Sequence, residues 1–301
     1  MSKKLHSEEY FGESRDFWWN HDFLALMAKR WNLSDARLVL DAGSGVGHWG
    51  RALAPHLHDD CKVVGVDQEL EWVGQATARA LARGLQNRFS YRQGNVDHLD
   101  FPDETFDVVT CQTVLIHVRN PERTIQEFMR VLRPGGLLAV AEPNNMAATL
   151  VLNSESFSHP IERILDLVKY HLACQRGKAA LGEGHNSIGD MLPGYFAKAG
   201  LRHIRTYSSD KASPMFAPYN DPEQSAIAAE MDVVDENPIS YGDRGQCRKY
   251  FLAGGGATDD FDRLWQTAVI DSSNECRASR KSGTYHTGGG GVVYLVSGIK
   301  E

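Results

Sequence analysis

The stretch Leu38-Val39-Leu40-Asp41-Ala42-Gly43-Ser44-Gly45-Val46-Gly47 decides the fold of this chain. It places a short apolar run before an acid and then glycine at every second position, a pattern typical of a buried strand that turns tightly into a helix. Glycine allows the backbone to pass close to a ligand, and the following helix presents its amino terminus at the same place. The stretch therefore predicts a ligand-binding turn at the carboxyl end of a strand.

A second acid supports this interpretation. Asp67 follows Asp41 by 26 residues and ends the apolar run Val63-Val64-Gly65-Val66. An acid at the end of a second parallel strand is placed to bond the ribose hydroxyls of a nucleoside. The two acids and the glycines together predict a nucleoside cofactor.

Strand and helix patterns alternate outward from this turn, which predicts a parallel sheet covered on both faces. Strands are predicted at Arg37–Asp41, Cys61–Asp67, Arg88–Arg92, Phe106–Cys111, Leu137–Ala141, Arg202–Tyr207 and Val292–Ile299. Helices are predicted at Val46–Leu57, Glu69–Arg83, Pro121–Leu132 and Gly189–Ala199.

We predict a single α/β domain over residues 1–301, because the last strand falls after a long helical stretch and would complete the same sheet. In this division 1–35 is an amino-terminal helical segment, 36–145 is the cofactor-binding core, 146–187 and 208–287 are helical cap insertions, and 188–207 and 288–301 complete the sheet. Insertions on an open α/β sheet affect ligand binding where they overhang the carboxyl ends of the strands.

Composition excludes several classes of protein. The 301 residues are 42% hydrophobic and carry a net charge of −7, so the chain is well cored and has no basic footprint for nucleic acid. The five cysteines are scattered and never spaced as CxxC, which argues against a disulfide framework and a zinc site. We see no secretory leader and no apolar run of membrane-spanning length, and we expect a cytoplasmic protein with no bound metal.

The identity of the cofactor depends on Asp41. The run Gly45-Val46-Gly47-His48-Trp49-Gly50 also satisfies the dinucleotide pattern GxGxxG, so an NAD-dependent oxidoreductase is a rival interpretation. A pyrophosphate at the helix amino terminus would be repelled by the acid that precedes the glycines. S-adenosylmethionine, with a cationic amino-acid end, suits that acid better.

The chain resembles the class I S-adenosylmethionine-dependent methyltransferases, particularly the branch that includes quinone-biosynthesis methyltransferases. Four segments carry the resemblance: Asp41-x-Gly43-x-Gly45-x-Gly47, Gly94-Asn95-Val96, Phe106-Asp107-Val108-Val109 and Arg130-Val131-Leu132-Arg133-Pro134-Gly135-Gly136. It implies a Rossmann-like, doubly wound, seven-stranded sheet in which the last strand, Val292–Ile299, is antiparallel and lies next to the fifth.

The resemblance also implies which residues bind S-adenosylmethionine. The glycines of the first motif would line the methionine moiety, Asp67 the ribose, and Asn95 and Val96 the adenine, with Asn95 in place of the usual aspartate. The predicted cofactor residues are Tyr10, Asp41, Gly43, Ser44, Gly45, Asp67, Gln68, Asn95, Val96 and Gln112.

We predict that the acceptor lies over the carboxyl ends of the fourth and fifth strands, with Glu142 and His117 as candidate catalytic residues. The run Cys111-Gln112-Thr113-Val114 stands where enzymes acting on nucleic-acid bases carry an Asn-Pro-Pro-Tyr-like sequence. A small-molecule acceptor is therefore expected. Besides methyl transfer, two functions stay open at this point: an NAD(P)-dependent oxidoreductase, and a non-catalytic scaffold that binds the cofactor.

Overall fold

The computed structural model describes residues 13–236 and 240–301, which divide into two compact units. The sheet unit consists of Trp19–Pro143, Ile188–Asp210 and Val293–Glu301. The helical unit consists of Met1–Trp18, Asn144–Ser187 and Lys211–Val292. The breaks between the units fall near the predicted edges of the two cap insertions, and whether the units behave as one domain stays a prediction. Among the described residues, no helix has the length and apolarity needed to cross a bilayer.

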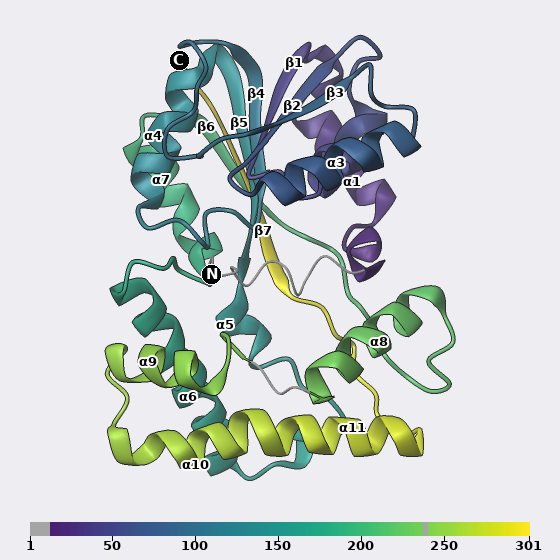
Figure 1. Cartoon of the computed structure of the whole chain (residues 1–301), viewed down its shortest axis with the longest axis vertical. Helices are drawn as coiled ribbons and strands as arrows, with labels where there is room; N and C mark the ends of the chain where they lie inside the picture. The colour runs from purple at the N-terminus through teal and green to yellow at the C-terminus, as the bar shows by residue number, and fades with distance from the viewer. Residues whose placement is uncertain (1–12, 237–239) are drawn as a thin grey trace. The chain divides into compact units, whose positions relative to one another are not determined.

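The sheet unit is built on seven strands in the order β3-β2-β1-β4-β5-β7-β6 (Figure 1). The strands are β1 Leu38–Ala42, β2 Lys62–Asp67, β3 Phe89–Gln93, β4 Phe106–Gln112, β5 Leu132–Asn144, β6 Arg202–Ser208 and β7 Val292–Ile299. Strands β1 to β5 pair in parallel, and β7 lies between β5 and β6 and runs antiparallel to β6. The predicted Rossmann-like sheet, with its last strand beside the fifth, is confirmed.

Helices cover both faces of this sheet, with α4 and α7 on one side and α1 and α3 on the other (Figure 1). The helices of the sheet unit are α1 His21–Arg30, α2 His48–Leu53, α3 Leu70–Ala82, α4 Pro121–Val131 and α7 Leu192–Lys198. Because both faces are covered, β4 is buried along its whole length, and its Phe106 packs in a core with Phe128 of α4 and Phe196 of α7. This rigid centre positions the turns at the carboxyl ends of β1, β2 and β4.

Three predicted elements have wrong boundaries. The helix expected at Gly189–Ala199 begins only at Leu192, after a 3-10 turn at Ile188–Met191. The helix expected at Val46–Leu57 begins only at His48 and gives way to a short 3-10 turn, Ala54–His56, because Pro55 has no amide hydrogen to continue it. Strand β5 begins at Leu132 rather than at Leu137. Its early part is extended because Gly135 donates to the carbonyl of Lys300 at 2.7 Å and Gly136 accepts from the Lys300 amide at 3.0 Å.

The helical unit has a core of its own, in which Tyr170 and Cys174 pack with Cys247, Phe251 and Trp265. Its helices are α5 Asn145–Ala148, α6 Ile161–Ala180, α8 Pro222–Glu236, α9 Arg244–Ala253, α10 Phe261–Trp265 and α11 Ser272–Ser282, with a π-helical segment, Gln266–Asp271, joining the last two. A side chain at Gly254 would collide with the α6 backbone at Ala173, so glycine permits α6 and α9 to cross closely.

Candidate functional site

The turn after β1 is a left-handed glycine turn. Gly43, Gly45 and Gly47 have φ angles of 68°, 50° and 74°, which side-chain-bearing residues rarely adopt. The Ser44 amide donates to the carbonyl of Val66 at 2.9 Å, which fastens this turn to β2. The predicted binding turn is therefore formed as the glycine pattern requires.

A second turn, the one after β4, closes against the first. A Cβ atom at Gly43 would lie 2.5 Å from a methyl carbon of Val114, so only glycine fits where these two turns meet. Residues 113–117 form this second turn, which we call the β4 turn. The predicted cofactor turn and the predicted acceptor-facing turn are thus in direct contact.

Asp67, at the end of β2, supports the glycine turn. Its Oδ2 accepts from the Gly45 amide at 2.8 Å and its Oδ1 accepts from the Glu69 amide at 3.0 Å. Burial raises the pKa of this carboxyl above its usual value. Since a carboxylate has about four lone-pair positions, it retains acceptor capacity for a ribose hydroxyl.

Asp41 is more deeply buried, with 1% of its surface exposed. Its Oδ2 accepts from the Gly50 amide at 3.0 Å, and burial raises the pKa of the carboxyl to about 7. Its Oδ1 and the hydroxyl of Ser44 are buried and have no hydrogen-bond partner among the residues that the structure describes. Buried polar atoms of this kind ordinarily have a partner, and a ligand with donors would supply one here.

Two residues that sequence reasoning missed lie beneath the glycine turn. A Cβ atom at Gly65 would collide with the ring of Tyr91, its partner on β3, and would lie 2.8 Å from the Ser44 hydroxyl. Arg51 of α2 donates to the carbonyl of Val46 at 2.5 Å. A glycine inside a strand is a known sign of close approach, so Gly65 was the signal that would have pointed to Tyr91.

The predicted adenine residues follow β3. The Gly94 amide donates to the Asp67 carbonyl at 2.9 Å, which brings this loop beside β2. Asn95 is exposed, and its Oδ1 accepts from the Asp97 amide at 2.9 Å. Val96 packs against the core of the sheet unit. The amide oxygen of Asn95 therefore already has a local donor.

The remaining predicted cofactor residues fall in three places. Gln112 is buried at the end of β4. Gln68 follows β2, and its carbonyl accepts from the Gln93 side chain at 2.9 Å. Tyr10 lies outside the described residues. All the described members of the predicted set belong to the sheet unit.

The two candidate catalytic residues lie at the β4 turn. Glu142 of β5 is fully buried, and burial raises the pKa of its carboxyl to about 7. It accepts hydrogen bonds from the amides of Val114 and Leu115, both at 2.8 Å. His117 ends the turn, its amide donating to the Val114 carbonyl at 2.9 Å. A direct role of either side chain in the reaction stays a prediction.

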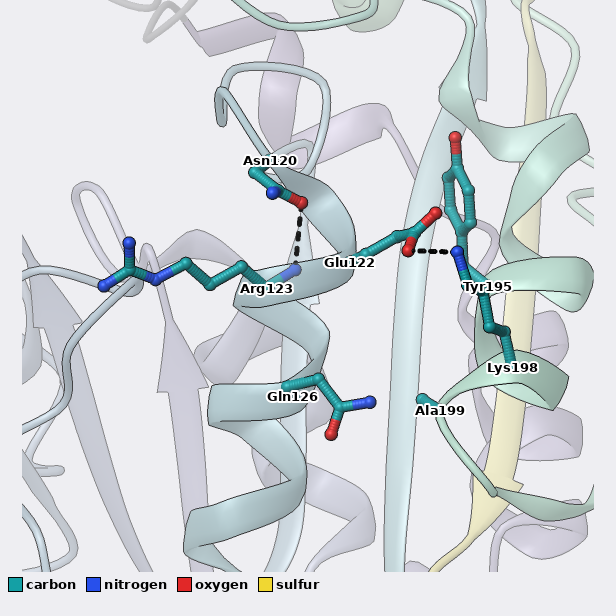
Figure 2. A pocket seen from close by; sticks show the side chains of 7 residues that line it. All are labelled: Asn120, Glu122, Arg123, Gln126, Tyr195, Lys198 and Ala199. Atoms are coloured by element: carbon teal, nitrogen blue, oxygen red, sulfur yellow. Dashed lines mark hydrogen bonds and ion pairs between the residues drawn. The ribbon is translucent and has the colours of Figure 1, made fainter.

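A separate surface pocket of about 310 Å³ lies between α4 and α7 (Figure 2). Its walls are mainly polar, and an ion pair between Lys198 and Glu122, at 2.6 Å, crosses it. No predicted cofactor or catalytic residue lines it. No group of three or more His, Cys, Asp or Glu side chains within 13–236 and 240–301 is arranged to hold a metal ion.

Residues 40–140 match the family model described as a methyltransferase domain. An uncharacterized methyltransferase, YcgJ of Bacillus subtilis, is 33% identical over 129 residues, which are 43% of this chain and 47% of that protein. The ubiquinone/menaquinone biosynthesis C-methyltransferase UbiE of Hydrogenovibrio crunogenus is 32% identical over 120 residues, 40% of this chain and 47% of the relative. The chain thus spans about half the length of these curated relatives.

Solved structures agree on the fold. The crystal structure of Bacillus subtilis YcgJ aligns with a TM-score of 0.52 at 20% identity, covering 94% of this chain and 99% of that one. The [4+2]-cyclase SpnF aligns with the same TM-score at 17% identity, covering 93% of this chain and 80% of the cyclase. The matched family segment contains the glycine turn, Asp67 and the β4 turn. Residues 40–140 of this chain thus match a methyltransferase domain, in agreement with the resemblance that the sequence carries.

Proposed function

We propose that this chain is an S-adenosylmethionine-dependent methyltransferase that transfers a methyl group to a small-molecule acceptor. The observation that carries the proposal is the glycine turn with its two buried acids. Asp67 retains acceptor capacity after binding two amides, and Asp41 and Ser44 each have a buried oxygen without a partner among the described residues. These groups suit a ligand that has ribose hydroxyls at one place and a cationic ammonium at another.

Different residues would bind different parts of S-adenosylmethionine. Asp67 would hold the ribose, Asp41 and Ser44 the amino-acid end, and Asn95 with Val96 the adenine, where Asn95 must exchange its bond to the Asp97 amide or accept a second one. When bound, S-adenosylmethionine supplies a methyl group already activated by its sulfonium charge. The protein then has to align the acceptor and exclude water, and such alignment is worth roughly 7 to 11 kcal/mol of the barrier.

Two other functions fit the same turn less well. An NAD(P)-dependent oxidoreductase would need to place a pyrophosphate beside Asp41, and the ionised carboxylate would repel it. A non-catalytic scaffold that binds the cofactor would have the same glycine turn but would transfer no methyl group. Because the fold also occurs in a [4+2]-cyclase, fold alone does not decide between transfer and other chemistry.

The cysteines and the net charge support a compartment and a class of acceptor. None of the five cysteines, all of which lie in the described ranges, forms a disulfide, which suits a reducing compartment. We therefore include a cytoplasmic location in the proposal. The net charge of −7 favours a small molecule over a nucleic acid as the acceptor.

The test is a labelled-methyl assay with Asp67→Ala as the matched variant. Wild-type protein incubated with methyl-labelled S-adenosylmethionine and a metabolite extract is expected to label a small molecule. Asp67→Ala should bind S-adenosylhomocysteine about tenfold or more weakly, since hydrogen bonds to a charged group are lost, while keeping its fold by circular dichroism. A scaffold would label nothing, and unchanged affinity in the variant would place the ribose elsewhere.

A further inference from the structure

Glu142 has an unusual set of partners for a candidate catalytic acid. Its Oε1 accepts from the amides of Val114 and Leu115 at 2.8 Å, and its Oε2 accepts from the amide of Ile116 at 3.3 Å. Successive amides that converge on one carboxylate form an anion-binding nest. The side chain is fully buried, and its Oε1 also accepts from the Cys111 thiol of β4 at 3.7 Å.

The β4 turn begins with a strained residue. Thr113 has a φ angle of 54°, which is uncommon for a β-branched side chain. Its amide donates to the Ala141 carbonyl at 2.9 Å and its hydroxyl donates to the Gln112 carbonyl at 2.7 Å. A conformation of this kind persists only where surrounding contacts over-determine it. The bonds to Glu142 hold the amides of the three residues after Thr113.

The position of the turn matters on both of its sides. Val114 packs against Gly43, so a shift of the β4 turn changes the space over the glycine turn. Gln112 precedes the turn and His117 ends it, and both belong to the predicted site. A single buried side chain therefore supports backbone that faces the proposed cofactor and backbone that faces the proposed acceptor.

We infer that Glu142 is a positioning residue: it binds the amides of residues 114–116, holds the β4 turn against Gly43, and so sets cofactor affinity and acceptor alignment together. The inference rests on the proposed function and deepens it. It differs from a direct chemical role, in which removal of the carboxylate would lower turnover and spare cofactor binding.

The experiment compares Glu142→Gln with Asp107→Asn. Asp107 serves as the control because it is also buried and accepts two backbone amides, those of Arg37 and Leu38 at 2.6 and 3.0 Å, but lies at the opposite end of β4, where its other oxygen pairs with Arg133 at 2.7 Å. Glutamine cannot offer two acceptor oxygens, so at least one amide loses its bond. We expect Glu142→Gln to raise the Kd for S-adenosylhomocysteine about tenfold and to speed hydrogen exchange at residues 114–116, while Asp107→Asn changes neither.

Three results would overturn the inference. One is Glu142→Gln with unchanged Kd and lost turnover, which would assign the carboxylate to the chemistry itself. A second is an equal loss of affinity in Asp107→Asn, which would mean that general destabilisation explains the effect. The third is unchanged exchange at residues 114–116.

A second variant tests the inference if Glu142→Gln does not fold. Val114→Ala keeps the amides and Glu142 but removes the packing on Gly43, and it should weaken S-adenosylhomocysteine binding; unchanged binding would contradict the inference. If wild-type protein binds no S-adenosylhomocysteine, the proposed function fails. The structural part of the inference, that Glu142 holds the β4 turn against Gly43, is then tested by hydrogen exchange at residues 114–116. Exchange is compared between Glu142→Gln and Asp107→Asn, or between Val114→Ala and wild type.

Discussion

Gly43 and Gly135 have similar backbone conformations and very different surroundings. Their φ angles are 68° and 74°, yet a Cβ atom at Gly43 would lie 2.5 Å from Val114 and one at Gly135 would have nothing within 4 Å. Alanine at either position costs backbone strain. Only at Gly43 does alanine also overpack the contact between the glycine turn and the β4 turn. Comparing the two alanine variants therefore distinguishes backbone strain from steric crowding.

We predict that Gly43→Ala lowers the free energy of unfolding by about 1 to 3 kcal/mol more than Gly135→Ala, measured by urea denaturation. It should also weaken S-adenosylhomocysteine binding, which Gly135→Ala should not. Adding Val114→Ala to Gly43→Ala should recover part of the stability. Equal destabilisation by the two glycine variants would show that Val114 does not crowd Gly43.

Asp41 predicts a pH dependence with a defined sign. Its pKa in the folded chain is raised to about 7 from 3.8, so the folded state holds a proton that the unfolded state has released between these values. Stability contributed by Asp41 is therefore greatest at low pH, falls as the pH rises from about 4 to about 7, and is constant above that. Burial of the charged carboxylate is the cause.

Asp41→Asn should remove this dependence. Relative to wild type, the variant should gain free energy of unfolding as the pH rises through this window, by at most about 1.4 kcal/mol per pH unit, measured by denaturant titration at each pH. A constant difference between Asp41→Asn and wild type would mean that the carboxylate is solvated in the folded protein.

At the scale of elements, the helix caps offer one test in each unit. Asn120 accepts from the Arg123 amide at 3.1 Å and begins α4 in the sheet unit, and Asp243 accepts from the Gln246 amide at 2.8 Å and begins α9 in the helical unit. Loss of such a cap costs about 0.5 to 2 kcal/mol. Each variant therefore weakens one identified unit.

If the chain is the single domain that its sequence predicts, Asn120→Ala and Asp243→Ala should both lower the midpoint of one common thermal transition, measured by calorimetry. Two transitions, each lowered by only one of the variants, would show that the sheet unit and the helical unit unfold separately.

The strands and the glycine turn were predictable from sequence because their signals are local. Alternating apolar runs and helical stripes mark the elements, and the motif residues mark the turn. The early start of β5 was not predictable, since it depends on pairing with Lys300, far along the chain. The short α2 had a local signal in Pro55, which outweighed the apolar pattern around it.

At the scale of the whole molecule, the site depends on contacts that no periodicity reveals. The sequence places Glu142 at the end of a buried strand, but its bonds to three amides of the β4 turn arise only when β4 and β5 pair. The same holds for Val114 and Gly43, which meet because β1 and β4 are neighbours. The residue types predicted which positions belong to the candidate site. The pairing of the strands determines which partner each of these side chains contacts.

The proposed function depends most on the identity of the ligand at the glycine turn. The most direct measurement is the melting temperature of the full chain with S-adenosylhomocysteine and, separately, with NAD⁺, since a ligand that binds only the folded protein raises it. We predict a concentration-dependent rise with S-adenosylhomocysteine and no rise with NAD⁺. A rise with NAD⁺ alone would contradict S-adenosylmethionine as the cofactor.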